Sequence, residues 1–247
     1  MSTVQQLPYI ASRLEGLEET IISKLIERAQ WHTNPTAYQE GKSGFGNNEK
    51  RSLLELRLSY QEEMDALFGR FCVPEERPFT DLKYRPQRTV SLPESGLHIP
   101  DYQKVNLTKK IYTAYQFLLK HICTEGDDGQ YGSSVEHDVY ALQAISRRVH
   151  FGALYVAECK YRSAPNVYKK LIAKKDEKAL LATLTRPEVE EKIIQRVQEK
   201  TRSLQQCANL ESRKVIKPET VVDFYQKTII PLTKEGEILY LLNRKQD

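Results

Sequence analysis

The sequence predicts an all-α protein, a bundle of several helices organised around one long central helix. Across residues 134–161, apolar side chains recur at steps of three and four, which is the period of a helix. They are Val135, Val139, Leu142, Ile145 and Val149. Helical spacing recurs in most other segments, and no stretch shows the alternation of a strand over a useful length. These observations together favour helix packed on helix.

The second half of the central helix also carries charged side chains, namely Arg147, Arg148, His150, Glu158 and Lys160. A helix this long exceeds the usual surface helix of up to about 20 residues, so much of it is expected to be buried. Unpaired charges rarely enter a core, because removing them from water is costly. Two interpretations stay open: the charges lie on a solvated face, or they line a cavity that binds an anion.

Apolar spacing predicts three helices in the first half of the chain, at about 10–31, 49–71 and 106–122. The first ends before Asn34-Pro35, because a residue that precedes proline avoids the α conformation. Asn106 is expected to cap the third helix. The apolar stripe of the second helix comprises Leu53, Leu56, Tyr60, Met64, Leu67 and Phe71.

Three segments in this half lack a helical period. Residues 36–48 are polar and glycine-rich, which predicts a surface loop. Residues 74–104 are rich in proline and predict a long irregular connection that packs across the helices, with a role in regulation or in an interface. The segment G-D-D-G-Q-Y-G-S-S, residues 126–134, leads into the central helix, with its serines as N-cap. It is either an anion site made by backbone amides or a plain turn between helices.

The second half predicts four more helices, at about 164–174, 176–184, 186–209 and 218–243. Thr185 and Glu188 have the spacing of a capping box, and Pro187 suits the first helical turn. Pro231 lies inside the last helix, where it removes one hydrogen bond and should bend the helix.

Composition is typical of a globular domain with a substantial core. The chain has 247 residues, of which 40% are hydrophobic and 28% charged, and we expect a single domain over residues 1–247. The formal charge is +4, but cations and anions alternate throughout, so a basic scaffold for nucleic acid is disfavoured. The four cysteines are scattered without a C-x-x-C pair, and the five histidines are dispersed, so neither a disulfide framework nor a metal site is indicated.

No apolar run approaches the roughly 18 residues that span a bilayer, so no membrane association is expected. The N-terminal residues M-S-T-V-Q-Q-L-P-Y-I show no basic segment followed by an apolar one and no transit-peptide composition. The expected location is therefore the cytoplasm.

The segment R-R-V-H-F-G-A-L-Y-V-A-E-C-K-Y, residues 147–161, is similar to R-R-I-H-F-G-K-F-V-A-E-A-K-F of the chorismate mutases of the all-helical eukaryotic type, found in yeast and plants (AroQ class). Four further segments match that family in family order: L-E-E-T-I-I-S-K-L-I-E-R-A, G-D-D-G-Q-Y-G-S-S, T-R-P-E-V-E-E-K-I and I-I-P-L-T-K-E-G-E. Several separate motifs in order are far more specific than one. The resemblance covers nearly the whole chain.

The resemblance implies an isomerase that rearranges chorismate to prephenate in phenylalanine and tyrosine biosynthesis. This unimolecular step needs no nucleophile, cofactor or metal. The dicarboxylate substrate must be held in its reactive conformer, and donors must face the ether oxygen, which gains negative charge as its C–O bond breaks. The catalytic helices would be those at about 10–31, 134–161, 186–209 and 218–243.

The resemblance also implies residue roles. Arg148 would bind a carboxylate, Lys160 would donate to the ether oxygen and a neighbouring carboxylate, and Glu190 would bind the substrate hydroxyl. Thr233 would help at a carboxylate and Glu237 would be the second ether-oxygen donor; the two lie on one helix face, at i,i+4. An ionised carboxylate only accepts hydrogen bonds, so Glu237 must be protonated, through a raised pKa.

Three departures from the family pattern affect this site. The family's N-terminal arginine position holds Ala11, and Arg13 lies two residues on, about 200° around a helix. One extra residue separates Arg148 from Lys160, and a π-bulge near residues 152–155 would absorb it. The asparagine of the yeast type is replaced by Arg186, which either contacts a carboxylate or points to solvent. Arg13 and Arg186 are therefore the less certain substrate-binding candidates.

The family further implies a homodimer whose interface, at about residues 65–136, holds a regulatory site for tyrosine or tryptophan. The matching effector-binding candidates are Arg70, Gln130, Gly132 and Ser133. Gly69 replaces one of the paired yeast arginines, so effector binding is expected to be weakened or retuned. A rival hypothesis also follows from the departures: a catalytically inactive binding or regulatory subunit of the same fold.

Overall fold

The computed structural model describes residues 6–46 and 48–245, and this part of the chain contains helices and no β-strand. The α-helices are α1 Leu7–Arg28, α2 Leu53–Leu67, α3 Thr108–Ile122, α4 Tyr131–Phe151, α5 Ala157–Ser163, α6 Pro165–Lys174, α7 Glu177–Leu184, α8 Pro187–Ser203, α9 Pro218–Phe224 and α10 Ile230–Asn243. Short 3₁₀ turns are η1 Pro35–Tyr38, η2 Arg70–Cys72 and η3 Tyr102–Val105. The all-α prediction is confirmed; residues 1–5 and 246–247, the ends of the expected domain, lie outside the described residues.

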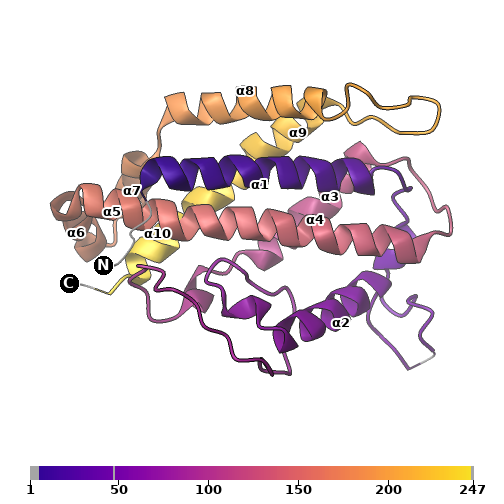
Figure 1. Cartoon of the computed structure of the whole chain (residues 1–247), viewed down its shortest axis with the longest axis horizontal. Helices are drawn as coiled ribbons and strands as arrows, with labels where there is room; N and C mark the ends of the chain where they lie inside the picture. Colours follow the sequence, from indigo (N-terminus) through magenta and orange to yellow (C-terminus); the bar gives the residue numbers. More distant parts are fainter. Residues whose placement is uncertain (1–5, 47, 246–247) are drawn as a thin grey trace.

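The bundle is arranged around α4, as the sequence predicts. Helices α1 and α4 run side by side, α8 lies beyond α1, and α2 lies beyond α4 (Figure 1). Helices α9 and α10 cross this layer and pack against α4, α7 and α8. The two ends of the described chain lie at the same end of the bundle, beside α5–α7 (Figure 1).

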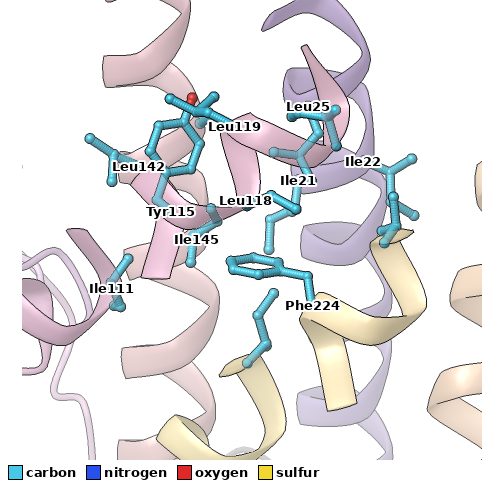
Figure 2. Packing of buried hydrophobic residues seen from close by; sticks show 14 of the residues in the cluster. Ile21, Ile22, Leu25, Ile111, Tyr115, Leu118, Leu119, Leu142, Ile145 and Phe224 are labelled. Carbon is cyan, nitrogen blue, oxygen red and sulfur yellow. The ribbon is translucent and has the colours of Figure 1, made fainter. Parts of the chain in front are cut away.

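The larger core cluster joins α1, α3, α4 and α9. Ile21, Ile22 and Leu25 of α1 are fully buried, and side chains from α3 and Phe224 of α9 pack against them (Figure 2). Leu142 and Ile145 supply the α4 side of the cluster. Burying such a side chain stabilises the fold by about 1.5–3 kcal/mol, so this cluster holds the long helices in a fixed register.

Two π turns interrupt the long helices. The π-helix η4, Gly152–Val156, continues α4 directly into α5, which confirms the predicted π-bulge. A second one, η5, Tyr225–Ile229, joins α9 to α10 and was not predicted. It ends two residues before Pro231, which lacks an N–H donor and whose ring crowds the preceding turn, so the wider turn accommodates the proline.

Both the start and the buried face of α2 differ from the prediction. α2 begins at Leu53 rather than at residue 49, because Ser52 and Glu55 form a capping box there. Tyr60 and Met64, placed on the apolar stripe of that helix, are 56% and 49% exposed. The buried face instead comprises Leu54, Leu56, Leu58, Glu62 and Ala66.

Three predicted caps also differ from the structure. α4 begins at Tyr131, so Ser133 lies in the first helical turn and does not cap it. α8 has Arg186 at its N-cap position without a side-chain cap, so the Thr185–Glu188 capping box is absent. The N-cap of α3 is Leu107, although the Asn106 side chain does accept a hydrogen bond from the Thr108 N–H, at 3.0 Å.

Residues 74–101 form an irregular connection as predicted, and η3 follows it. Hydrogen bonds to buried side chains hold this connection in place. The Glu62 carboxylate accepts hydrogen bonds from the N–H groups of Phe79 and Thr80, at 2.9 and 2.8 Å. Farther along, the Tyr240 hydroxyl accepts a bond from the His98 N–H, at 3.0 Å. The connection therefore packs as part of the fold and closes one side of α4.

Candidate active site

A cavity of about 580 Å³ lies between α1, the α4–α5 junction, α8 and α10. All five predicted catalytic residues line it: Arg148, Lys160, Glu190, Thr233 and Glu237. They come from three separate segments of the chain, and the fold brings them together. This decides between the two interpretations of Arg148 and Lys160, since both face a cavity.

The Arg148 guanidinium is buried in the wall of this cavity, with 2% of the residue exposed. Its Nη1 donates to Thr233 Oγ1 at 3.1 Å, and the Thr233 hydroxyl donates in turn to the Ile229 carbonyl at 2.7 Å. The buried Nε of Arg148 has no hydrogen-bond partner within the described residues. A buried donor without a partner is unusual, and here it leaves the guanidinium able to bind an anion.

Gly152 allows α10 to pack close to α4. A Cβ at this position would lie 2.7 Å from Thr233 Cγ2 and 3.3 Å from Arg148 Nη1. The absence of a side chain therefore lets α10 come close to α4, with Thr233 within hydrogen-bond reach of Arg148.

Lys160 and Glu237 form a second pair, in which Glu237 is buried and Lys160 half-buried. Lys160 Nζ donates to Glu237 Oε2 at 2.9 Å and to the Leu184 carbonyl at 2.8 Å. Glu237 is 4% exposed, and burial raises the pKa of its carboxyl group, against the opposing effect of Lys160, Lys234 and Arg148. A carboxyl with a raised pKa can be protonated and donate a hydrogen bond.

The π-helix η4 aligns Arg148 with Lys160. In an uninterrupted α-helix, their spacing would place them about 120° apart around the axis, at about 100° per residue. With one residue absorbed in a π turn, the angle falls to about 20°. The extra residue in the sequence motif therefore leaves both cations in the same cavity.

Several charged residues that line the cavity were not predicted as site residues, among them Glu18, Arg196 and Lys234. Glu18 accepts two hydrogen bonds from Arg196, both at 2.8 Å, which clamp α1 to α8. Lys234 forms an ion pair with Glu190 at 2.5 Å, between α10 and α8. Glu18 lies four residues after Leu14 on the apolar side of its helix, and a charge in that position was the available signal.

Arg13, a predicted substrate-binding candidate, does not line this cavity. Its guanidinium lies over the Phe151 ring, 5.3 Å from the centroid, and Nη1 donates to the Tyr9 hydroxyl at 3.3 Å. Ala11 lines the catalytic cavity instead. Helix α1 begins at Leu7, so Ala11 and Arg13 are both helical. Because they are about 200° apart around the helix axis, they lie on different sides of α1.

Arg186 does line the cavity, at the start of α8, and it is exposed. Its backbone carbonyl accepts hydrogen bonds from the Val189 and Glu190 N–H groups, whereas its side chain makes no hydrogen bond or ion pair within residues 6–46 and 48–245. In total, six cationic side chains and five carboxylates line the cavity. With Glu237 protonated, the cavity carries two positive charges in excess, which matches a dicarboxylate.

The effector-binding candidates do not meet within one chain. The Arg70 guanidinium donates to Asp65 at 2.8 Å, to Glu76 at 3.0 Å and to Gln143 at 2.6 Å. Gln130 lies at the start of α4, thirteen residues before Gln143, or about 20 Å along the helix axis. Gly132 and Ser133 lie in the same first turn of α4, far from Arg70.

No helix among the described residues is long and apolar enough to cross a membrane. Over residues 6–46 and 48–245 there is also no group of three or more His, Cys, Asp or Glu side chains arranged to hold a metal ion.

No family model matches the chain, whereas curated proteins and solved structures do. The chain is 37% identical to chorismate mutase 2 of Arabidopsis thaliana, over 98% of this chain and 94% of that protein. It is 35% identical to chorismate mutase of Saccharomyces cerevisiae, over 99% and 97%. The crystal structure of a Candida albicans chorismate mutase in complex with L-tryptophan superposes with a TM-score of 0.91 at 36% identity, covering 99% of this chain and 94% of that one. The chain therefore belongs to the all-helical chorismate mutases of the yeast and plant type, a family of isomerases.

Proposed function

We propose that the cavity between α1, α4–α5, α8 and α10 converts chorismate to prephenate, the step that leads to phenylalanine and tyrosine. One observation supports this most: Arg148 and the Lys160–Glu237 pair, a carboxylate ligand and two candidate ether-oxygen donors, face the same cavity. Since the reaction is a unimolecular rearrangement, binding geometry and fixed charges suffice for catalysis.

Arg148 binds one substrate carboxylate, and Thr233 helps at that carboxylate by orienting the guanidinium. A guanidinium presents a planar fork that matches a carboxylate, and the unpartnered Nε gives Arg148 a donor for it. The Thr233 hydroxyl already accepts from Arg148, which holds the guanidinium in one orientation. Fixing one end of the flexible substrate in this way selects its folded conformer.

Lys160 and the protonated Glu237 donate to the ether oxygen. The C–O bond breaks while the new C–C bond forms, and negative charge grows on the oxygen in between. Donors held in place before the reaction stabilise that charge without reorganising. The Leu184 carbonyl keeps Lys160 in position when Glu237 turns its proton toward the substrate.

Arg186 binds the second carboxylate, and Glu190 binds the substrate hydroxyl. Arg186 has no competing ion pair within the described residues, and Ala11 supplies no cation from the α1 wall of the cavity. Lys234 orients Glu190 through their ion pair. Glu190 would then accept a hydrogen bond from the substrate hydroxyl, since an ionised carboxylate is an acceptor only.

The rival hypothesis, an inactive binding subunit, is not favoured by the site, because all five predicted catalytic residues line one cavity. The deciding experiment follows the loss of chorismate absorbance with purified wild-type protein and with Lys160→Ala. We expect turnover by the wild type and its loss in the variant. No turnover by folded wild type would favour the inactive subunit.

The protein is also proposed to act as a homodimer that binds an aromatic amino acid between its subunits. Tyr60, Met64 and Phe68 form an exposed apolar row on α2, and Phe68 is 69% exposed. A second copy covering this row would also supply the missing half of an effector site, because Arg70 and Gln130 are far apart in one chain. The Candida albicans relative was solved with L-tryptophan. Sedimentation equilibrium of the wild type and of Phe68→Glu tests the dimer, and a monomeric wild type would contradict it.

A cytoplasmic location is proposed as well. One relative is named as the cytosolic chorismate mutase 2 of Zea mays, while others are named as chloroplastic. Cell fractionation of the full-length protein tests the location, and recovery with organelles would contradict it.

A further inference from the structure

A second cavity, of about 710 Å³, lies on the other side of the helical wall that carries Arg148 and Lys160. Val156 of η4 lines the catalytic cavity, whereas its neighbour Tyr155 lines the second one. In the same way, Ala11 of α1 faces the catalytic cavity and Arg13 faces the second. The π-helix therefore separates two distinct cavities.

Arg13 presents a positive charge that no carboxylate neutralises within residues 6–46 and 48–245. Its one hydrogen bond is to the uncharged Tyr9 hydroxyl, at 3.3 Å, and its guanidinium lies over the Phe151 ring. Because the side chain is half-buried, some of its hydration is lost without an ion pair in exchange. This arrangement leaves the guanidinium free to bind an anionic group.

Glu75 presents a carboxylate to the same cavity, although only 4% of the residue is exposed. Its closest side-chain contacts are long: Tyr155 Oη at 3.5 Å and Arg147 Nη2 at 4.0 Å. A buried carboxylate normally receives short hydrogen bonds from several donors. Arg13 does not supply one, since no ion pair of 4.0 Å or less joins it to Glu75, although its charge acts on that carboxyl group.

Aromatic rings form the wall between these two charges. The rings of Phe151 and Tyr155 lie 4.7 Å apart at 36°, and both residues are at least nine-tenths buried. Tyr9 and Tyr102 complete the lining. Tyr9 is exposed and Tyr102 half-buried, so a ligand with a flat apolar group can pack against these two rings.

We propose that this second cavity binds a small zwitterion with an apolar ring, of the α-amino acid type. Its ammonium pairs with Glu75, its carboxylate pairs with Arg13, and its ring packs on Tyr9 and Tyr102. The site is separate from the catalytic cavity and does not depend on the proposed reaction. It is also separate from the Arg70 region, where the guanidinium is already bound by Asp65, Glu76 and Gln143.

Isothermal titration calorimetry with the full chain tests the site, using L-phenylalanine and two analogues that each lack one charge. Phenethylamine lacks the carboxylate and 3-phenylpropanoate lacks the ammonium. We expect the wild type to bind L-phenylalanine at least about tenfold more tightly than either analogue, since each lost charge pair removes a charge-assisted hydrogen bond. Arg13→Gln should weaken L-phenylalanine but not phenethylamine. Glu75→Gln should weaken L-phenylalanine but not 3-phenylpropanoate.

An Arg70→Gln variant serves as the control for the effector region of the proposed dimer. If this variant loses L-phenylalanine while Arg13→Gln and Glu75→Gln bind it as the wild type does, the second cavity is not the site. Failure of the wild type to bind L-phenylalanine overturns the proposal as well. If Glu75→Gln does not fold, nuclear Overhauser effects from the ligand ring to the Val73 methyl groups, which line the cavity, give an independent test on the wild type. Their absence at saturating ligand counts against the site.

Discussion

Lys160 Nζ and Glu237 Oε2 lie 2.9 Å apart in a cavity where Glu237 is almost completely buried. Two competing effects act on this carboxyl group. Burial raises its pKa, and the neighbouring Lys160 opposes that rise; the balance is a raised pKa. The pair thus provides one permanent donor, the ammonium, and one donor that depends on pH.

The first prediction concerns the pH dependence that Glu237 imposes on catalysis. Only the protonated carboxyl donates to the ether oxygen, so kcat/KM should fall as pH rises through the raised pKa, by about tenfold per pH unit. Glu237→Gln keeps an N–H donor at every pH and should give a flat profile. Steady-state rates from mildly acidic to mildly alkaline pH provide the measurement. A wild-type profile as flat as that of the variant would contradict the role.

The second prediction concerns the second substrate carboxylate. Arg186→Asn should lower kcat/KM by about 10- to 100-fold, mainly through KM, because a charge-assisted bond of about 1.5–3 kcal/mol is lost. Adding Ala11→Arg should restore part of that loss, because it puts a guanidinium on the α1 wall of the same cavity. Lys178→Gln, which removes one exposed charge outside the cavity lining, is the matched control. Wild-type kinetics for Arg186→Asn would exclude this arginine from the site.

A third prediction tests the close approach of α10 to α4. In Gly152→Ala, the new methyl would lie 2.7 Å from Thr233 Cγ2, so Thr233 must move away from Arg148. We expect kcat/KM to fall at least about tenfold and the free energy of unfolding to fall by about 1–3 kcal/mol, as in other overpacked cores. Gly16→Ala is the control, since a Cβ there meets nothing within 4 Å and removing a helical glycine is expected to stabilise slightly. Equal kinetics for the two variants would show that this approach is unimportant for catalysis.

A fourth prediction concerns acid stability and His150, which is fully buried between α3 and α4. Its Nε2 accepts a hydrogen bond from the Leu107 N–H at 3.0 Å, and Nδ1 donates to the Ser146 carbonyl at 2.7 Å. Burial lowers the pKa of His150 from 6.5 to about 4. Between these two pH values the unfolded chain binds the proton and the folded chain does not, so stability falls as pH falls from about 6.5 to 4.

The full loss from His150 amounts to about 3 kcal/mol, from a pKa difference of about 2.5 units. Urea unfolding of the wild type and of His150→Gln at several pH values measures it. The glutamine keeps one donor and one acceptor but does not titrate. The difference in free energy of unfolding between the two proteins should change across that window. A constant difference would mean that His150 does not titrate as the structure implies.

Helical periodicity predicted much of the fold, because an amphipathic helix shows its buried face in its spacing. Leu142, Ile145 and Val149 are buried as expected. The spacing also predicted the π-bulge, because one extra residue between Arg148 and Lys160 had to be absorbed if both were to face one cavity. Cap positions were less predictable. Ser52 begins α2 through a capping box with Glu55, whereas α3 begins after Leu107 without a side-chain cap.

The sequence by itself determined the all-helical class, because helical periodicity is a local property. It also indicated the five catalytic candidates, because they lie in short motifs shared with the family. Only the tertiary structure decided where Arg13 and Arg186 lie and which charges are already paired. Arg70 is bound by Gln143 and Glu18 by Arg196, partners that lie 73 and 178 residues away in the chain. A side chain's availability depends on which distant charges the packing of the helices brings within a few ångströms of it, and local spacing does not specify those partners.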